Sequence, residues 1–190
     1  MLNQWVYDLA VWLDTHAWST MLHESYYMYN WIETTHVLTL MVSLGMLFLI
    51  DLRMLGYALP GVPATRLAER LNMPMLIGFS VMFLTGMLLF YAIPVRSAQS
   101  VWFRIKFLLL IAAAINAFLF HRGLKAAGDR WDNDGQAPAS LRRGAILSLL
   151  FWMLVVICGR LIAYDWFDCS HGQSGWVAVA AGCLDGQAQF

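Results

Sequence analysis

The chain has 190 residues, of which 60% are hydrophobic and 13% are charged, and its formal net charge at pH 7 is zero. With a mean hydropathy of +0.60, it is either a very apolar soluble domain or a small membrane protein. The basic residues flank long apolar segments, which excludes a basic surface for nucleic acid.

The first 30 residues predict an amphipathic helix that lies along the outer interface of a membrane. Several residues there recur at helical spacing, namely Trp5, Leu9, Trp12, Leu13 and His16. The first basic residue of the chain is Arg53. The basic region of a signal peptide is therefore missing, and we expect the N-terminal segment to be retained.

Four uncharged runs follow, at 34–50, 71–95, 107–120 and 144–159. Each reaches about 20 residues, the length of a membrane span, if a charged side chain near its end snorkels to the interface. The predicted spans are 31–52, 73–93, 102–121 and 144–165. Because the connections are short, we predict an all-α membrane protein: an up-down-up-down four-helix bundle that forms one domain over 1–190, with a tail at 166–190.

Local patterns predict where these spans begin and end. Asn30 and Glu33 match the two positions of a capping box at the start of the first span. The segment 72–74, which ends in proline, is expected to start the second span. Ser100 is placed to cap the third span, and Gly123 is placed to end it.

The basic residues also predict the orientation. Eight of the 12 lie in the loops after the first and third spans: Arg53, Arg66, Arg70, Arg122, Lys125, Arg130, Arg142 and Arg143. By the positive-inside rule these loops are cytoplasmic and both tails lie on the outer side of the membrane. Cys169 and Cys183 then lie in an oxidising compartment, which favours a disulfide between them. Cys158 is predicted to be a small packing residue within the fourth span.

Ionisable side chains inside membrane spans are costly and are functional candidates by default. Three of them, on three different spans, lie about 6 to 8 Å below the predicted outer interface at 1.5 Å per residue: His36, Lys106 and Arg160. Glu33 lies one turn outside His36, while Thr39 and Ser43 continue the same stripe inward. In an antiparallel bundle, these side chains can form one polar cluster.

Three kinds of site suit such a cluster. In a quinone site, His36 with Glu33 would accept quinol protons, and Lys106 or Arg160 would stabilise the anion. In a b-type haem site, His36 would be an axial ligand and the two cations would pair with propionates, but a second histidine at the same depth is missing. A copper site would combine His36 with residues of the first segment and its junction with span one: His16, Met21, His23 and Met28.

A purely structural interpretation of the same residues is open as well. Lys106 and Arg160 can snorkel to the interface, Glu33 can cap its helix, and His36 can hydrogen bond to a neighbouring span. Two other polar features have structural predictions: Asp51 and Arg53 as an interfacial ion pair, and Asn116 as an interhelical hydrogen bond.

Three motifs together resemble an uncharacterised family of small bacterial four-span inner-membrane proteins. They are E-x-x-H at 33–36, D-L-R-x-L-G at 51–56 and K-x-x-L-L-x-x-A-x-x-N at 106–116. The likeness extends over about 25 to 165 and implies the four-span fold without a particular activity. The layout looks more distantly like copper-resistance D-type and cytochrome b561-like bundles, although the paired histidines of the latter are missing.

From these patterns we expect a membrane subunit for electron transfer at the periplasmic face, with a quinone or a haem b held by His36, Lys106 and Arg160. Its partners would be the lipid bilayer and other redox subunits, so any activity would be that of a non-autonomous redox subunit. A non-catalytic anchor or assembly subunit of a larger complex and a copper-handling protein are the alternatives.

Overall fold

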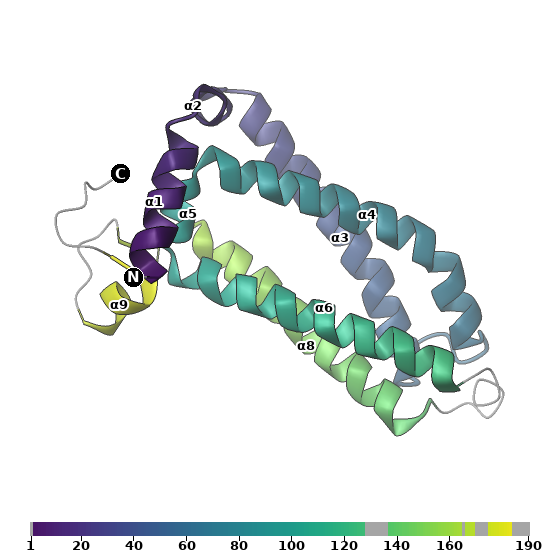
Figure 1. The fold of residues 1–190 in the computed structure, drawn as a ribbon. Coiled ribbons are helices and arrows are strands. Elements are labelled where there is room, and N and C mark those ends of the chain that lie inside the picture. The colour runs from purple at the N-terminus through teal and green to yellow at the C-terminus, as the bar shows by residue number, and fades with distance from the viewer. Residues whose placement is uncertain (1, 128–136, 165, 170–174, 184–190) are drawn as a thin grey trace. The chain divides into compact units, whose positions relative to one another are not determined.

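The computed structural model describes residues 2–127, 137–164, 166–169 and 175–183. Within these ranges the regular structure is entirely helical (Figure 1). The four long helices are α3 (Met28–Met54), α4 (Ala64–Ala92), α6 (Val101–Ala127) and α8 (Ala139–Ile162). The short helices are α1 (Leu2–Asp14), α2 (Ala17–Glu24), α5 (Pro94–Ala98) and α9 (Trp176–Ala181). The predicted class, an all-α four-helix membrane bundle, is confirmed.

The chain divides into two compact units, each of which contains part of every long helix. Unit 1 comprises 1–36, 83–108 and 156–190, and unit 2 comprises 37–82 and 109–155. Unit 1 therefore holds the first turns of α3 and α6 and the last turns of α4 and α8. The long helices alternate in direction, as the up-down-up-down prediction requires.

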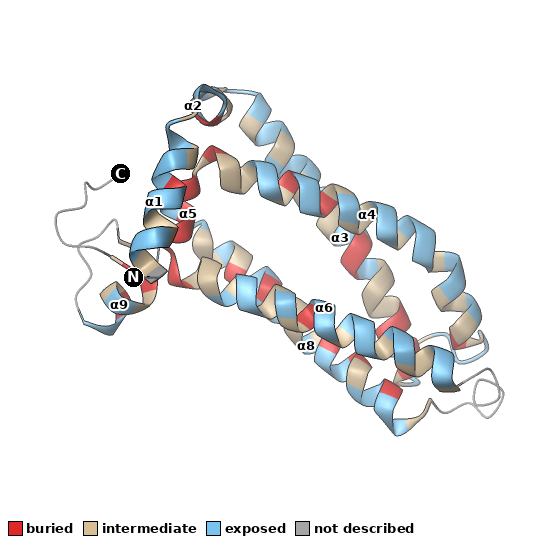
Figure 2. Ribbon diagram, viewed as in Figure 1, coloured by how far each residue is buried: buried red, intermediate tan, exposed pale blue. Residues whose placement is uncertain are grey.

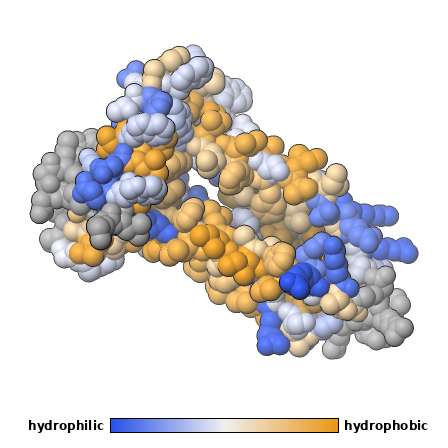
Figure 3. Space-filling model, in the orientation of Figure 1, coloured by the Kyte–Doolittle hydropathy of each residue, from blue (hydrophilic) through white to orange (hydrophobic). Residues whose placement is uncertain are grey.

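All four long helices are apolar enough to cross a membrane, and most of their apolar side chains point outward. In the most apolar window of α6 only 6% of the residues are buried, and in that of α3 the share is 33%. Figure 3 shows the resulting hydrophobic surface along the visible sides of α4 and α6. Because a helix satisfies its own backbone hydrogen bonds, such a surface is stable against lipid.

The predicted start of the second span and the predicted end of the third span are wrong. Helix α4 begins at Ala64 rather than near Pro74, which lies inside the helix. Helix α6 continues to Ala127, past Gly123. Gly123 lies against Leu141 of α8, and a Cβ at position 123 would be 3.3 Å from its Cδ2 atom. This glycine therefore permits close helix packing instead of ending the helix. Ser100 immediately precedes α6, as expected.

Gly56 ends helix α3. Its φ of 84° is left-handed, a conformation that glycine adopts without steric cost. The Tyr57 amide donates to the Leu52 carbonyl at 2.9 Å, and the Gly56 amide donates to the Arg53 carbonyl at 3.0 Å. These two bonds form a Schellman motif, which satisfies carbonyls at the helix end that would otherwise lack a partner.

The predicted N-terminal helix is two helices in the structure, with a break between Asp14 and Ala17. Helix α1 packs on α5 through Val6, Tyr7 and Ala10, and four of the five residues of α5 are buried (Figure 2). Helix α2 is attached to the end of α4 by the Ser19 hydroxyl, which donates to the Tyr91 carbonyl at 2.7 Å.

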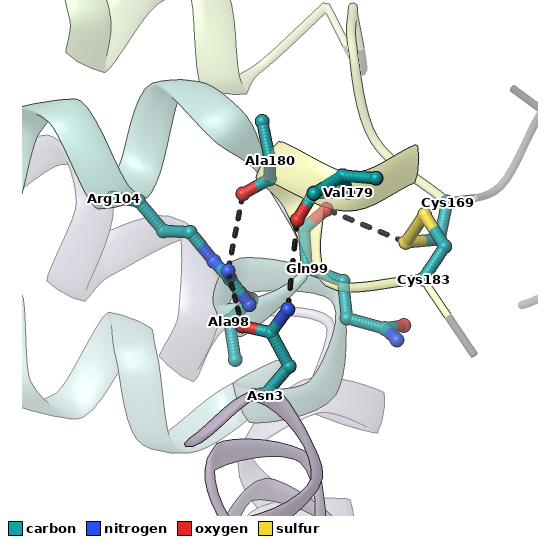
Figure 4. The surroundings of a disulfide bond; sticks show 8 residues. All are labelled: Asn3, Ala98, Gln99, Arg104, Cys169, Val179, Ala180 and Cys183. Carbon is teal, nitrogen blue, oxygen red and sulfur yellow. Dashed lines mark hydrogen bonds between the residues drawn. A yellow bond between two sulfur atoms is a disulfide. The ribbon is translucent and has the colours of Figure 1, made fainter. Parts of the chain in front are cut away.

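Arg104 of α6 joins the N-terminal and C-terminal segments of unit 1 (Figure 4). Its guanidinium donates to Asn3 Oδ1 of α1 at 2.9 Å, to the Ala180 carbonyl of α9 at 3.0 Å and to the Ala98 carbonyl at 3.1 Å. Helix α9 ends at Gly182, whose φ of 77° lets the Cys183 amide bond back to the Ala178 carbonyl at 2.8 Å.

The turn at Gly182 also brings Cys183 to Cys169. Their sulfur atoms are 2.04 Å apart and their Cα atoms are 5.5 Å apart, which is disulfide geometry. The pairing predicted from the sequence is therefore formed in the structure. Cys158, which was predicted to be a packing residue, is a free buried cysteine.

Candidate functional site

His36 lies in the part of α3 that belongs to unit 1, and it contacts α4. Its Nδ1 atom is 2.9 Å from the Thr85 hydroxyl, which is buried. The edge of the ring lies against Gly86, where a Cβ would be 3.2 Å from the His36 Cε1 atom. The imidazole is half-buried, so the hydroxyl and the glycine together hold it in one orientation between two apolar helices.

Glu33 is exposed, one turn before His36 on the same helix. It acts electrostatically on the phenol of Tyr29, as does Arg96 of α5. The predicted capping box is wrong, because Asn30 lies within the helix and its side chain donates to the Tyr26 carbonyl at 2.9 Å. Ser25 caps α3 instead, since its hydroxyl accepts the Met28 amide at 3.1 Å. Glu33 is thus left without the capping role and lies on the His36 side of the helix.

Lys106 lies on α6, also in unit 1, and packs against α8. A Cβ at position 159 would be 3.6 Å from its Nζ atom, so the ammonium group occupies the space left by Gly159. The Cys158 thiol, next to this glycine, interacts electrostatically with the ammonium. A Cβ at this distance makes an ordinary van der Waals contact, so alanine at position 159 would leave the ammonium group in place.

Arg160 is exposed and bonds within its own helix end. Its guanidinium donates to the Tyr164 hydroxyl at 2.9 Å and lies 4.8 Å from the centroid of the Tyr164 ring. The contacts described here for Arg160 and Lys106 are with Tyr164, Gly159 and Cys158. Their convergence into one cluster stays a prediction.

Thr39 and Ser43, the predicted inward extension of the polar stripe, belong to unit 2. Both face Gly78 of α4, and a Cβ at position 78 would collide with the Ser43 hydroxyl. The side chain of Ser43 is fully buried, and its oxygen has no hydrogen-bond partner in the part of the chain that the structure describes.

The residues considered for copper lie at the break between α1 and α2, in α2 and in α3. The Nδ1–H of His16 donates to the Trp12 carbonyl at 2.8 Å, and His23 packs edge-on against Tyr29 at 6.5 Å between ring centroids. Met21 and Met28 are exposed. The described residues contain no group of three or more His, Cys, Asp or Glu arranged to hold a metal ion.

Sequence reasoning missed three residues that contact His36 or Lys106: Thr85, Gly86 and Gly159. Threonine in an apolar span is usually satisfied by its own helix, and glycine is common in membrane helices, so neither residue type is distinctive. The adjacent pair Thr85–Gly86 within an uncharged run of 25 residues, 71–95, is the signal that was available. In chemical terms, unit 1 combines a held imidazole, an exposed carboxylate one turn away and a lysine on a neighbouring span.

Comparison with known proteins identifies the family and nothing further. No curated protein and no solved structure matches the chain. None of the comparisons links the chain to copper-resistance D-type or cytochrome b561-like bundles. Residues 17–165, which include all four long helices, match a family of unknown function, DUF6644. The chain belongs to this family.

Proposed function

We propose that the protein is a membrane electron-transfer subunit that binds a quinol in unit 1, with His36 as the proton acceptor. The observation that carries the proposal is the His36–Thr85 hydrogen bond of 2.9 Å together with the close approach of the ring to Gly86. A general base has to be held within hydrogen-bond reach of the proton it removes, and this pair supplies an oriented imidazole inside an apolar bundle.

The neighbouring side chains suit the other requirements of quinol oxidation. Glu33 lies three residues before His36, a rise of about 4.5 Å along the helix, and it is exposed. It can pass the proton from the imidazole to water. Lys106 can stabilise the negative charge on the second quinol oxygen. Oxidation of the quinol releases two protons, which His36 accepts one after the other and Glu33 passes on. The two electrons go one at a time to a haem or iron–sulfur centre of a partner subunit.

A quinol suits these residues better than a haem or a copper ion. A b-type haem needs a second axial ligand, and the other histidines of unit 1 within the described ranges are directed to Trp12 and Tyr29. A reduced-minus-oxidised absorption spectrum of the purified protein tests this choice directly, because a b-type haem would give Soret and α bands.

Binding of decylubiquinone to the purified protein in lipid nanodiscs tests the site, with tryptophan fluorescence as the readout. Thr85→Val keeps the side-chain shape and removes the hydroxyl, so we expect affinity to fall about fivefold, the equivalent of one hydrogen bond of about 1 kcal/mol. His36→Ala should weaken binding further. Thr35→Val is the matched control, because the Thr35 hydroxyl bonds to the Trp31 carbonyl of its own helix. Unchanged binding in His36→Ala would rule out the site.

The second candidate is a non-catalytic anchor, and the surface of α1 favours it. Helix α1 packs one side on α5 and leaves Trp5, Leu9 and Trp12 exposed on the other. Such aromatic side chains suit either a protein partner or the membrane interface. The anchor function becomes the better proposal if quinone does not bind.

A further inference from the structure

Unit 2 contains a buried carboxyl group that the quinol site does not use. Asp51 lies in the last turn of α3, and only 3% of its surface is exposed. Its neighbours Ile50 and Met54 belong to a hydrophobic cluster with Leu141 and Ala145 of α8. A carboxyl group in such surroundings is costly unless its charge is compensated.

The hydrogen bonding of Asp51 does not compensate a negative charge. Its carboxyl group bonds with the hydroxyl of Ser148 of α8, which is also buried. The second oxygen, Oδ2, is buried and has no hydrogen-bond partner in the described ranges. An ionised carboxylate offers about four acceptor positions, so a single hydroxyl leaves most of them unused.

Arg53 does not supply the missing charge. Residues two apart on a helix point to nearly opposite sides, and the Arg53 Nε–H donates to the Val62 carbonyl at 2.6 Å. The ion pair predicted between Asp51 and Arg53 is therefore wrong. The remaining charged or titratable side chains of the described part of unit 2 are exposed, either in the α3–α4 loop or on α4, α6 and α8: Tyr57, Arg66, Glu69, Arg70, His121, Arg122, Lys125, Arg142 and Arg143.

The position of Asp51 in its helix also disfavours a negative charge on the carboxyl group. The C-terminal end of a helix carries a partial negative charge, which disfavours a carboxylate in the last turn. Asp51 lies three residues before Met54, the end of α3, and so about 6 Å of helix rise separates it from position 55, where the loop 55–63 begins. The group is buried and lies about one helical turn from the end of α3.

We propose that Asp51 is a proton-binding site: its carboxyl group carries a proton at neutral pH and exchanges it with the aqueous side on which the α3–α4 loop lies. Ser148 is the hydrogen-bond partner of the acid. Asn116 of α6 donates to the Gly144 carbonyl at 3.0 Å, one turn from Ser148, and provides the next polar group. The site lies in unit 2 and does not depend on quinol binding in unit 1.

Labelling with dicyclohexylcarbodiimide tests the proposal, because this apolar reagent requires a protonated acid. The acid proton moves to a carbodiimide nitrogen while the carboxyl oxygen bonds to the carbodiimide carbon. We expect the full-length protein in nanodiscs at neutral pH to be labelled at Asp51, as located by peptide mass spectrometry. Labelling should be lost in Asp51→Asn and unchanged in Asp8→Asn, which alters an exposed carboxylate.

A sodium series separates a proton from a metal cation at the same group. Labelling that is equal in sodium chloride and in choline chloride supports proton binding, whereas protection by sodium would overturn it in favour of a cation site. Absence of labelling at Asp51 in a protein with an intact helical circular dichroism spectrum would also overturn it. Asp51→Asn resembles the neutral acid, so it should retain the thermal midpoint of the unaltered protein, and a large drop would contradict a neutral Asp51.

Discussion

At the residue scale, His36 shows how an ionisable side chain is accommodated between two apolar helices. One ring nitrogen bonds to the Thr85 hydroxyl, and the ring edge uses the space left by Gly86. The sequence predicted His36 as the principal functional candidate, since it lies inside a span. It did not predict the partner, because the rotation of α3 against α4 decides which side chain meets the ring, and hydropathy does not report rotation.

Gly86→Val should displace the His36 ring. The added Cβ alone would lie 3.2 Å from Cε1, and overpacking of this kind typically costs about 1 to 3 kcal/mol. We expect a lower thermal midpoint and weaker decylubiquinone binding. Gly45→Val is the matched control on a long helix, because a Cβ at position 45 meets no atom within 4 Å. Equal effects of the two substitutions would mean that the His36–Gly86 contact is unimportant.

Three polar residues of the spans show which contacts can be inferred without a structure: Asp51, Arg53 and Asn116. The interhelical bond of Asn116 is confirmed, since a lone amide in mid-span needs a partner on another helix. The ion pair between Asp51 and Arg53 was inferred from proximity in sequence alone. Helical geometry directs the two side chains apart, and each has a different partner.

At the element scale, the glycines decide where helices end and where they pack. Gly56 and Gly182 have left-handed backbones and end α3 and α9, whereas Gly123 remains inside α6. Gly123 follows a basic residue, as a C-cap glycine often does, which is why it was assigned to the helix end. The contact with Leu141 of α8 is tertiary information that the local sequence does not contain.

Gly56→Ala should destabilise the protein by about 1 to 2 kcal/mol, the cost of a left-handed backbone for a residue with a Cβ. Equilibrium unfolding in detergent micelles measures this loss. Gly61→Ala in the same loop is the control, because that glycine meets no neighbour and has no left-handed backbone. A loss in Gly61→Ala as large as in Gly56→Ala would show that the loop as a whole, rather than the helix end, is sensitive.

The disulfide should stabilise the segment that docks on Arg104. Cys169 and Cys183 are 14 positions apart, and closing a loop of about 15 residues contributes about 3 kcal/mol to stability in the chain-entropy description. We expect the double variant Cys169→Ser, Cys183→Ser to show faster amide hydrogen exchange at 178–183. Dithiothreitol should produce the same increase in the unaltered protein and in Cys158→Ala, but no additional change in the double variant.

At the scale of the whole molecule, the hydrophobic pattern predicts the number of spans and their alternating direction. Each predicted span coincides with one long helix, and all four helices extend several residues beyond a predicted limit. The added residues at the end of α3, the start of α4, the end of α6 and the start of α8 include charged side chains. Hydropathy locates the hydrocarbon segment, whereas the helix continues until a glycine or a loop ends it.

The orientation remains a prediction with a direct test. Eight of the 12 basic residues lie between the predicted spans 31–52 and 73–93 or between 102–121 and 144–165, so we expect the α3–α4 and α6–α8 connections in the cytoplasm. Alkaline phosphatase fused after Phe190 should be active in intact cells, and a green fluorescent protein at that site should be dark. A fusion after Ala127 should give the reverse pattern. Active phosphatase at Ala127 would invert the assignment of the two faces.

Arg104 has a consequence for the order in which the protein is made. Its guanidinium contacts Asn3, which is translated before α3, and Ala180, which is translated after α8. Helix α1 therefore lacks one of its anchors until all four spans have been inserted and α9 has been translated. A nascent chain that stops after α8 would have its spans in the membrane but an unfinished N-terminal segment, and quality-control proteases could recognise that segment.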